Sequence, residues 1–163
     1  LAAPRAAVTL VETPLEERNA AVSPNGRWLV YEGEGEGRPG RLEILVRRFP
    51  TGSGQWQVAS NGGVHPVWSA DGRELFYRES TGAVMSAAVD ADANTWSSAA
   101  PVKLFDGQYL VRTNDLGRNY DVSLDGQRFL MISLRPADPS AEPLHMVVVQ
   151  NWLAELQRLV PAD

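Results

Sequence analysis

The feature that most constrains this fold is a turn motif that the chain repeats three times. The copies run from Ser23 to Tyr31, from Ser69 to Tyr77 and from Ser123 to Met131. Each copy has a serine, a spacer, Asn-Gly or Asp-Gly, one or two polar residues and then an apolar run. Asn-Gly and Asp-Gly favour the positive φ of tight turns, and the apolar runs suit strands. The motif therefore predicts three similar β-hairpins.

Composition narrows the classes of function. Fourteen glycines and eleven prolines in 163 residues indicate many turns, while a net charge of −5 argues against nucleic acid as the main partner. Cysteine is absent, which excludes disulfides, thiolate zinc sites and a cysteine nucleophile. No apolar run approaches the roughly 20 residues of a membrane helix, so we expect no membrane insertion. The sequence predicts no cofactor and no metal centre.

Strand patterns around the turns predict an all-β chain. The copies lie about 50 residues apart, as in β-propeller blades, and predict units at 19–59, 65–106 and 119–150. The first two units contain four strands each, whereas the third contains three before an amphipathic helix expected at 151–160. An additional strand at 8–13 supplies the fourth strand of the last unit. The prediction is one domain over 1–163, a partial β-propeller of three four-stranded blades with a short C-terminal α-helix.

Three blades make half of a six-bladed ring and do not close. Two alternatives resolve this: the chain is cut from a larger propeller, or two copies meet about a two-fold axis. We predict the homodimer, in which strand 8–13 of each copy completes the third blade of the other.

The turns resemble those of TolB-like six-bladed propellers, which are related to WD repeats. The motifs that carry this resemblance are Ser-Pro-Asn-Gly-Arg-Trp at 23–28, Pro-Val-Trp-Ser-Ala-Asp-Gly-Arg at 66–73 and Tyr-Asp-Val-Ser-Leu-Asp-Gly at 120–126. The segments 46–50, 74–77, 104–107 and 151–156 are similar to a narrower group, the C-terminal propellers of bacterial proteins that often carry an N-terminal serine/threonine kinase domain. The resemblance implies protein association or ligand sensing, and favours a periplasmic or extracytoplasmic location.

The turn alignment places Asn19, His65 and Asn119 at one equivalent position, four residues before each serine. In a propeller this position begins the innermost strand beside the channel. One interpretation is a polar collar that binds a ligand or peptide at the channel mouth. The alternative is that the three side chains cap strand starts through local hydrogen bonds.

Other candidate features have simpler interpretations. The alternating Gly-Glu segment at 33–37 and the acidic segment at 90–94 supply oxygen ligands, but neither follows the EF-hand pattern. We interpret the first as a solvated hairpin tip. Trp56 and Trp96 fall outside the repeat and are expected to be less buried than the repeated aromatic residues.

The sequence therefore predicts a non-catalytic binding or scaffolding propeller, which associates with protein or senses a ligand at the channel mouth. One alternative is a regulatory or sensor segment of a bacterial serine/threonine kinase. Kinase chemistry itself is excluded from this segment, because Lys103 is the sole lysine and no His-Arg-Asp loop exists. A second alternative is a hydrolase or lyase with a channel site, but the inner strands carry mostly Ala, Val and Trp.

Overall fold

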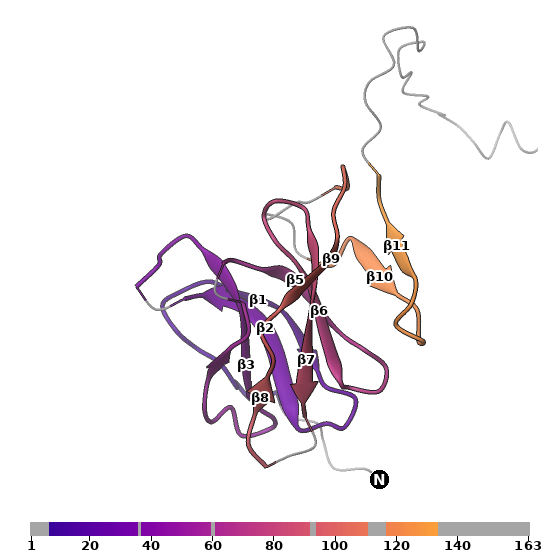
Figure 1. Cartoon of the computed structure of the whole chain (residues 1–163). Coiled ribbons are helices and arrows are strands. Elements are labelled where there is room, and N and C mark those ends of the chain that lie inside the picture. The colour runs from indigo at the N-terminus through magenta and orange to yellow at the C-terminus, as the bar shows by residue number, and fades with distance from the viewer. Residues whose placement is uncertain (1–6, 36, 60, 92–93, 111–116, 134–163) are drawn as a thin grey trace, which may run out of the picture.

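The fold is all-β and antiparallel. The computed structural model describes residues 7–35, 37–59, 61–91, 94–110 and 117–133, and within these ranges it contains strands and no helix (Figure 1). The last part of the third predicted unit, from residue 134 to 150, and the helix expected at 151–160 lie outside the described residues. The all-β prediction is confirmed for the described part of the chain.

The strands form two sheets and a separate hairpin, which follow one another along the chain (Figure 1). Sheet I is a meander of β1 (Glu17–Val22), β2 (Trp28–Glu34), β3 (Leu42–Arg48) and β4 (Trp56–Gln57). Sheet II contains β5 (Val64–Trp68), β6 (Glu74–Arg78), β7 (Val84–Asp90), β8 (Ser97–Ser98) and β9 (Val102–Phe105). Hairpin III consists of β10 (Tyr120–Val122) and β11 (Phe129–Met131). The sheets are open and do not close into a barrel.

The fourth position of sheet II is divided between two short strands. β9 pairs with the first half of β7, and β8 pairs with its last two residues. Pro101 lies between β8 and β9, and proline cannot donate a ladder hydrogen bond. The predicted strand at 102–105 is confirmed, whereas β8 has too little apolar pattern to have been predicted.

The three repeated turns have the same hydrogen bonds. In the first, the Ser23 hydroxyl accepts the N–H of Trp28 at 3.0 Å and donates to Oδ1 of Asn25 at 2.8 Å. The same contacts recur in the turns at 69–74 and 123–128. The three glycines have φ of 69–71°, so the left-handed residue is the glycine, while the Asn or Asp contributes a side-chain acceptor.

The main core lies between the two sheets. Trp28, Val30 and Ile44 of sheet I pack against Leu75 and Tyr77 of sheet II within one buried cluster. The Trp28 indole donates to the carbonyl of Ala91 at 2.7 Å, and its ring meets those of Trp56 and Trp96 edge to face. The expectation that Trp96 is less buried was wrong, because it fills the space between the two sheets and is 7% exposed.

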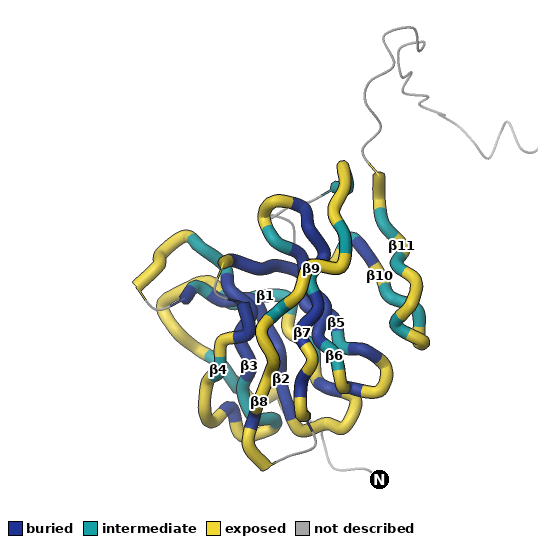
Figure 2. Tube along the Cα trace, in the orientation of Figure 1, coloured by how far each residue is buried: buried dark blue, intermediate teal, exposed yellow. Residues whose placement is uncertain are grey.

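Hairpin III packs against the opposite side of sheet II. The rings of Phe76 and Phe129 meet edge to face with centroids 5.3 Å apart, in a cluster with Val67 and Tyr120. We call the face of a unit toward the preceding unit its rear face and the face toward the next unit its forward face. In sheet II, Leu75 and Tyr77 lie on the rear face and Phe76 lies on the forward face. Figure 2 shows the burial changing along the series, from the largely buried strands of sheets I and II to the more exposed β10 and β11.

The positions of three strands differ from those expected from the sequence. Residues 8–13 form no strand. β1 begins at Glu17, because two of its residues extend the pairing with β2 beyond a bulge. Gly33 belongs to β2 and not to the following loop, since it pairs with Glu43 and lies buried.

Candidate functional site

Asn19 and His65 have the same unusual backbone conformation. Their φ angles are 51° and 56°, and they are the positive-φ residues other than glycine in the described part of the chain. Each lies in a bulge near the start of an inner strand, between Arg18 and Ala21 in β1 and between Val64 and Val67 in β5. Positive φ is uncommon outside glycine, and bulges redirect side chains. The equivalence predicted from the turn alignment is therefore present in the backbone of the first two units.

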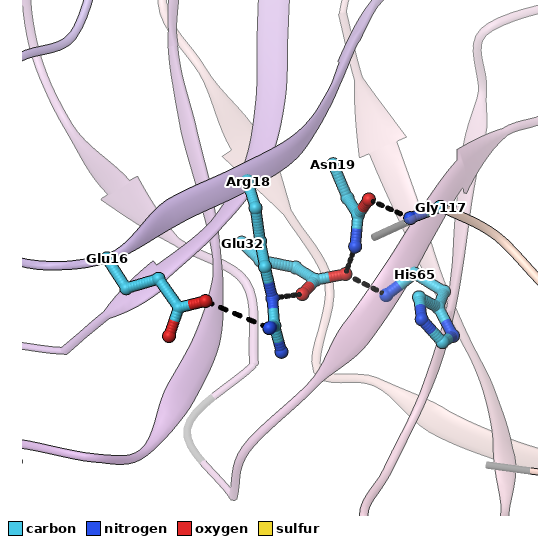
Figure 3. A network of polar contacts seen from close by, with 6 residues as sticks. All are labelled: Glu16, Arg18, Asn19, Glu32, His65 and Gly117. Atoms are coloured by element: carbon cyan, nitrogen blue, oxygen red, sulfur yellow. Dashed lines mark hydrogen bonds and ion pairs between the residues drawn. The ribbon is translucent and has the colours of Figure 1, made fainter. Parts of the chain in front are cut away.

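The buried carboxylate of Glu32 is the centre of a polar network that includes both residues (Figure 3). It accepts the Asn19 amide N–H at 2.7 Å and the main-chain N–H of His65 at 2.5 Å. The Arg18 guanidinium donates to it at 2.8 Å and to Glu16 at 2.9 Å. A charge removed from water requires a partner and several hydrogen bonds. Glu32 has both, so this network joins sheet I to sheet II.

The third unit joins the same network. Oδ1 of Asn19 accepts the N–H of Gly117 at 2.8 Å (Figure 3). The Tyr120 hydroxyl donates to the carbonyl of His65 at 2.8 Å. Burial raises the pKa of Tyr120, which therefore stays protonated as a donor. The two bulges are thus tied to the segment that leads into hairpin III.

Asn119 is positioned differently from its two counterparts. It precedes β10 and is half-buried, and its amide donates to the carbonyl of Leu110 at 3.0 Å. The structure therefore brings Asn19 and His65 together through Glu32, while Asn119 binds the preceding loop. His65 is 1% exposed in the single chain. Their proposed action as a ligand collar stays a prediction, and the hydrogen bonds supply the structural alternative.

Sequence reasoning missed Glu32, although the repeat contained a signal. Glu32 follows its turn serine by nine residues, and the residues at that distance in the other units are Arg78 and Ile132. Arg78 is also fully buried, and it donates to the carbonyls of Leu110 and Gly82 at 2.8 and 2.9 Å. Burial lowers the pKa of Arg78. A charged residue directly after the apolar run of the motif in two aligned units indicates a buried polar junction.

The polar groups of this site act as fixed hydrogen-bond donors and acceptors. The carboxylate of Glu32 accepts hydrogen bonds from an arginine, an amide and a backbone N–H, which holds it in place between the two sheets. Among the described residues, no group of three or more His, Asp or Glu side chains is placed to hold a metal ion. The described residues also contain no helix of the length and apolarity needed to cross a membrane.

No family model matches the chain, and no curated protein matches it either. The likeness to TolB-like propellers therefore rests on the turn motifs, and the function is argued below from the geometry.

Proposed function

We propose that this chain is a non-catalytic scaffolding and binding module, half of a six-bladed β-propeller that closes with a second copy of itself. One observation carries the proposal. Leu130 is 74% exposed, whereas the residues at the same position of the first two units, Val30 and Phe76, are 0% and 1% exposed. Val30 and Phe76 are buried because another unit packs on their forward face. By this repeat, no unit within the described residues packs on the forward face of hairpin III.

The exposed forward face of hairpin III carries Leu130 and Ile132, together with the charged Asp121, which pairs with Leu130 across the hairpin. Ile132 is 51% exposed next to Leu130. Adjacent apolar side chains of this size in water indicate a contact surface when they form a patch. The two earlier junctions already use this face to bind the next unit, so a third junction of the same kind continues an existing interface.

A second copy of the chain offers the matching surface. The rear face of sheet I has a hollow of about 330 Å³, whose apolar lining includes Val8, Leu10, Ala20 and Leu29. Leu29 aligns with Leu75 of sheet II and Phe129 of hairpin III, both of which face the preceding unit. Leu130 of one copy is therefore expected to pack against the lining of this hollow in the other copy, where Val8 is 75% exposed and Leu29 is 8% exposed. A two-fold axis makes this contact twice and completes the ring.

Residues 8–13 run beside this hollow, so the proposed exchange needs little movement. Val8, Leu10 and Val11 contribute to the lining. At the proposed junction these residues lie next to the other copy, where they would pair with its third blade. In the closed ring, Asn19 and His65 of both copies would lie near one mouth of the central channel. A protein or peptide partner would bind at this mouth.

The oligomeric state tests this proposal. Light scattering coupled to size-exclusion chromatography is expected to give twice the 17.8 kDa chain mass at about 10 µM. Leu130→Glu should convert the protein to a folded monomer, because it places two charges per dimer in the junctions. Leu124→Glu is the matched control, since Leu124 is 89% exposed in the turn and should leave the dimer intact. A folded monomer for the unmodified chain would overturn the proposal.

A further inference from the structure

The chain contains two Asn-Gly pairs, Asn25-Gly26 and Asn61-Gly62. Asparagine before glycine is especially prone to deamidation, because glycine has no side chain that would hinder attack by its backbone nitrogen. That nitrogen attacks the side-chain carbonyl carbon of the asparagine and expels ammonia. Water then opens the resulting cyclic imide to aspartate or isoaspartate, so a neutral amide becomes a carboxylate. Both asparagines are exposed, and exposure alone does not distinguish them.

The first pair is held by hydrogen bonds that oppose this reaction. The attacking N–H, which belongs to Gly26, donates to the carbonyl of Ser23 at 2.8 Å. Oδ1 of Asn25 accepts the N–H of Arg27 at 3.0 Å, and Nδ2 donates to the carbonyl of Ala91 at 2.8 Å. Both reacting groups are therefore engaged elsewhere, and the turn must open before the nitrogen can approach the carbon.

The second pair lacks these restraints. It lies in the loop between β4 and β5. Neither the Gly62 N–H nor the Asn61 side chain forms a hydrogen bond with any residue in the described part of the chain. The two pairs thus share the same dipeptide and the same exposure but differ in hydrogen bonding, and each serves as a reference for the other within one molecule.

Deamidation of Asn25 would remove a contact between the two sheets. The Ala91 carbonyl accepts the Asn25 amide and also the Trp28 indole, at 2.8 and 2.7 Å. An aspartate at this position has no N–H to donate and brings its charge toward that carbonyl oxygen. The turn itself accepts aspartate, because Asp71 and Asp125 make the same local bond from Oδ1 in the other two turns. The loss therefore falls on the junction between sheets I and II.

We propose that Asn25 is a latent deamidation site, which the folded turn protects and whose modification loosens the junction between sheets I and II. Asn61 is its reactive counterpart in the folded chain. Modification of Asn25 follows opening of the first turn and then makes that opening harder to reverse. The inference concerns a single chain and goes beyond the proposed binding function, so it does not depend on ring closure.

Rates of deamidation at both sites of the full chain test the protection. The protein is incubated at mildly alkaline pH, either folded in buffer or unfolded in urea. Peptide mass spectrometry then gives the fraction of aspartate and isoaspartate at each asparagine. In buffer, Asn25 should react at least about tenfold more slowly than Asn61, whereas in urea the two rates should become similar. Equal rates in buffer, or a difference that persists in urea, would overturn the proposal.

A second measurement isolates the consequence for the junction. Asn25→Asp reproduces the aspartate product and should speed hydrogen exchange of the Trp28 indole N–H by at least about fivefold. Asn61→Asp makes the same change outside the junction and should leave that exchange unaltered. Unchanged exchange in a folded Asn25→Asp variant would contradict the role assigned to the amide. The rate comparison uses the unmodified chain, so it does not depend on the folding of either variant.

Discussion

The main-chain N–H of His65 lies 2.5 Å from Oε1 of Glu32, and this bond ties the bulge of sheet II to the second strand of sheet I. The donor is the backbone N–H, so the contact depends on the positive φ of residue 65. The imidazole ring takes no part in it. The carboxylate completes its hydrogen bonding with Asn19 of the other bulge. Glu32 therefore links the bulges of the first two units.

Replacing Glu32 with glutamine should destabilise the protein strongly. The amide keeps one acceptor, but its NH₂ group then faces the Arg18 guanidinium, whose side chain is only 7% exposed. Breaking a buried charge pair in this way costs about 3 kcal/mol. Urea denaturation should show this loss for Glu32→Gln and almost none for Glu12→Gln, which is exposed. Equal stability of the two variants would show that the network does not join the sheets.

Removing the Tyr120 hydroxyl should loosen hairpin III from sheet II. Tyr120→Phe leaves the ring in its cluster but removes the donor to the buried His65 carbonyl. We expect a loss of about 1–2 kcal/mol and faster amide hydrogen exchange in β10 and β11. Tyr109→Phe serves as the control, because no hydrogen bond of its hydroxyl occurs among the described residues. If both variants exchange alike, Tyr120 does not anchor the hairpin.

The glycine of the first turn should tolerate asparagine better than alanine. Gly26 has φ of 71°, and a Cβ placed there meets no heavy atom within 4 Å, so the cost of substitution is conformational. Gly26→Ala should lose about 1 kcal/mol, and Gly26→Asn should lose less, since asparagine visits the left-handed region more readily. Thermal unfolding of both variants checks this order, and the reverse order would refute the explanation.

The second turn should lower the pKa of its own aspartate. Ser69 donates to Asp71 and the Arg73 N–H adds a second bond, so the pKa of Asp71 lies below its usual 3.8. The charged form is favoured in the folded state. This contribution to stability is therefore present above pH 3.8 and is lost as the pH falls further, through the folded-state pKa.

Ser69→Ala tests that account by NMR titration of the Asp71 carboxyl group. Loss of the first and largest cause should raise the pKa of Asp71 toward 3.8. Asp125 in the third turn receives the same pair of bonds and acts as an internal reference that should not change. A pKa of Asp71 that is unaffected by the substitution would assign the shift to the backbone bond alone.

Local patterns predicted the all-β class and its antiparallel hairpins, because turn chemistry and strand alternation act over a few residues. The repeat at Ser23, Ser69 and Ser123 located three hairpins, and the alignment recovered a backbone bulge shared by Asn19 and His65. In contrast, the burial of a side chain and the identity of its hydrogen-bond partners depend on contacts between residues far apart in the chain. No local signal showed that Trp96 fills the space between sheets.

Dependence on distant residues also explains why the sequence did not predict the contacts of the candidate site. Glu32 and His65 are 33 residues apart, and their hydrogen bond exists only because two units pack together. The sequence identified the position of His65 but assigned its role to the side chain. The structure adds a role for its backbone, which the residue type alone does not indicate.

The divided outer edge of sheet II has a consequence for how the protein behaves at high concentration. A long regular edge strand is a template on which other chains add and grow into fibres. Here β8 and β9 offer two and four residues with Pro101 between them, and proline withholds one of the required N–H groups. An edge divided in this way is a poor template for lateral growth, so we expect it to lower the tendency of this strand-rich chain to form amyloid-like fibres.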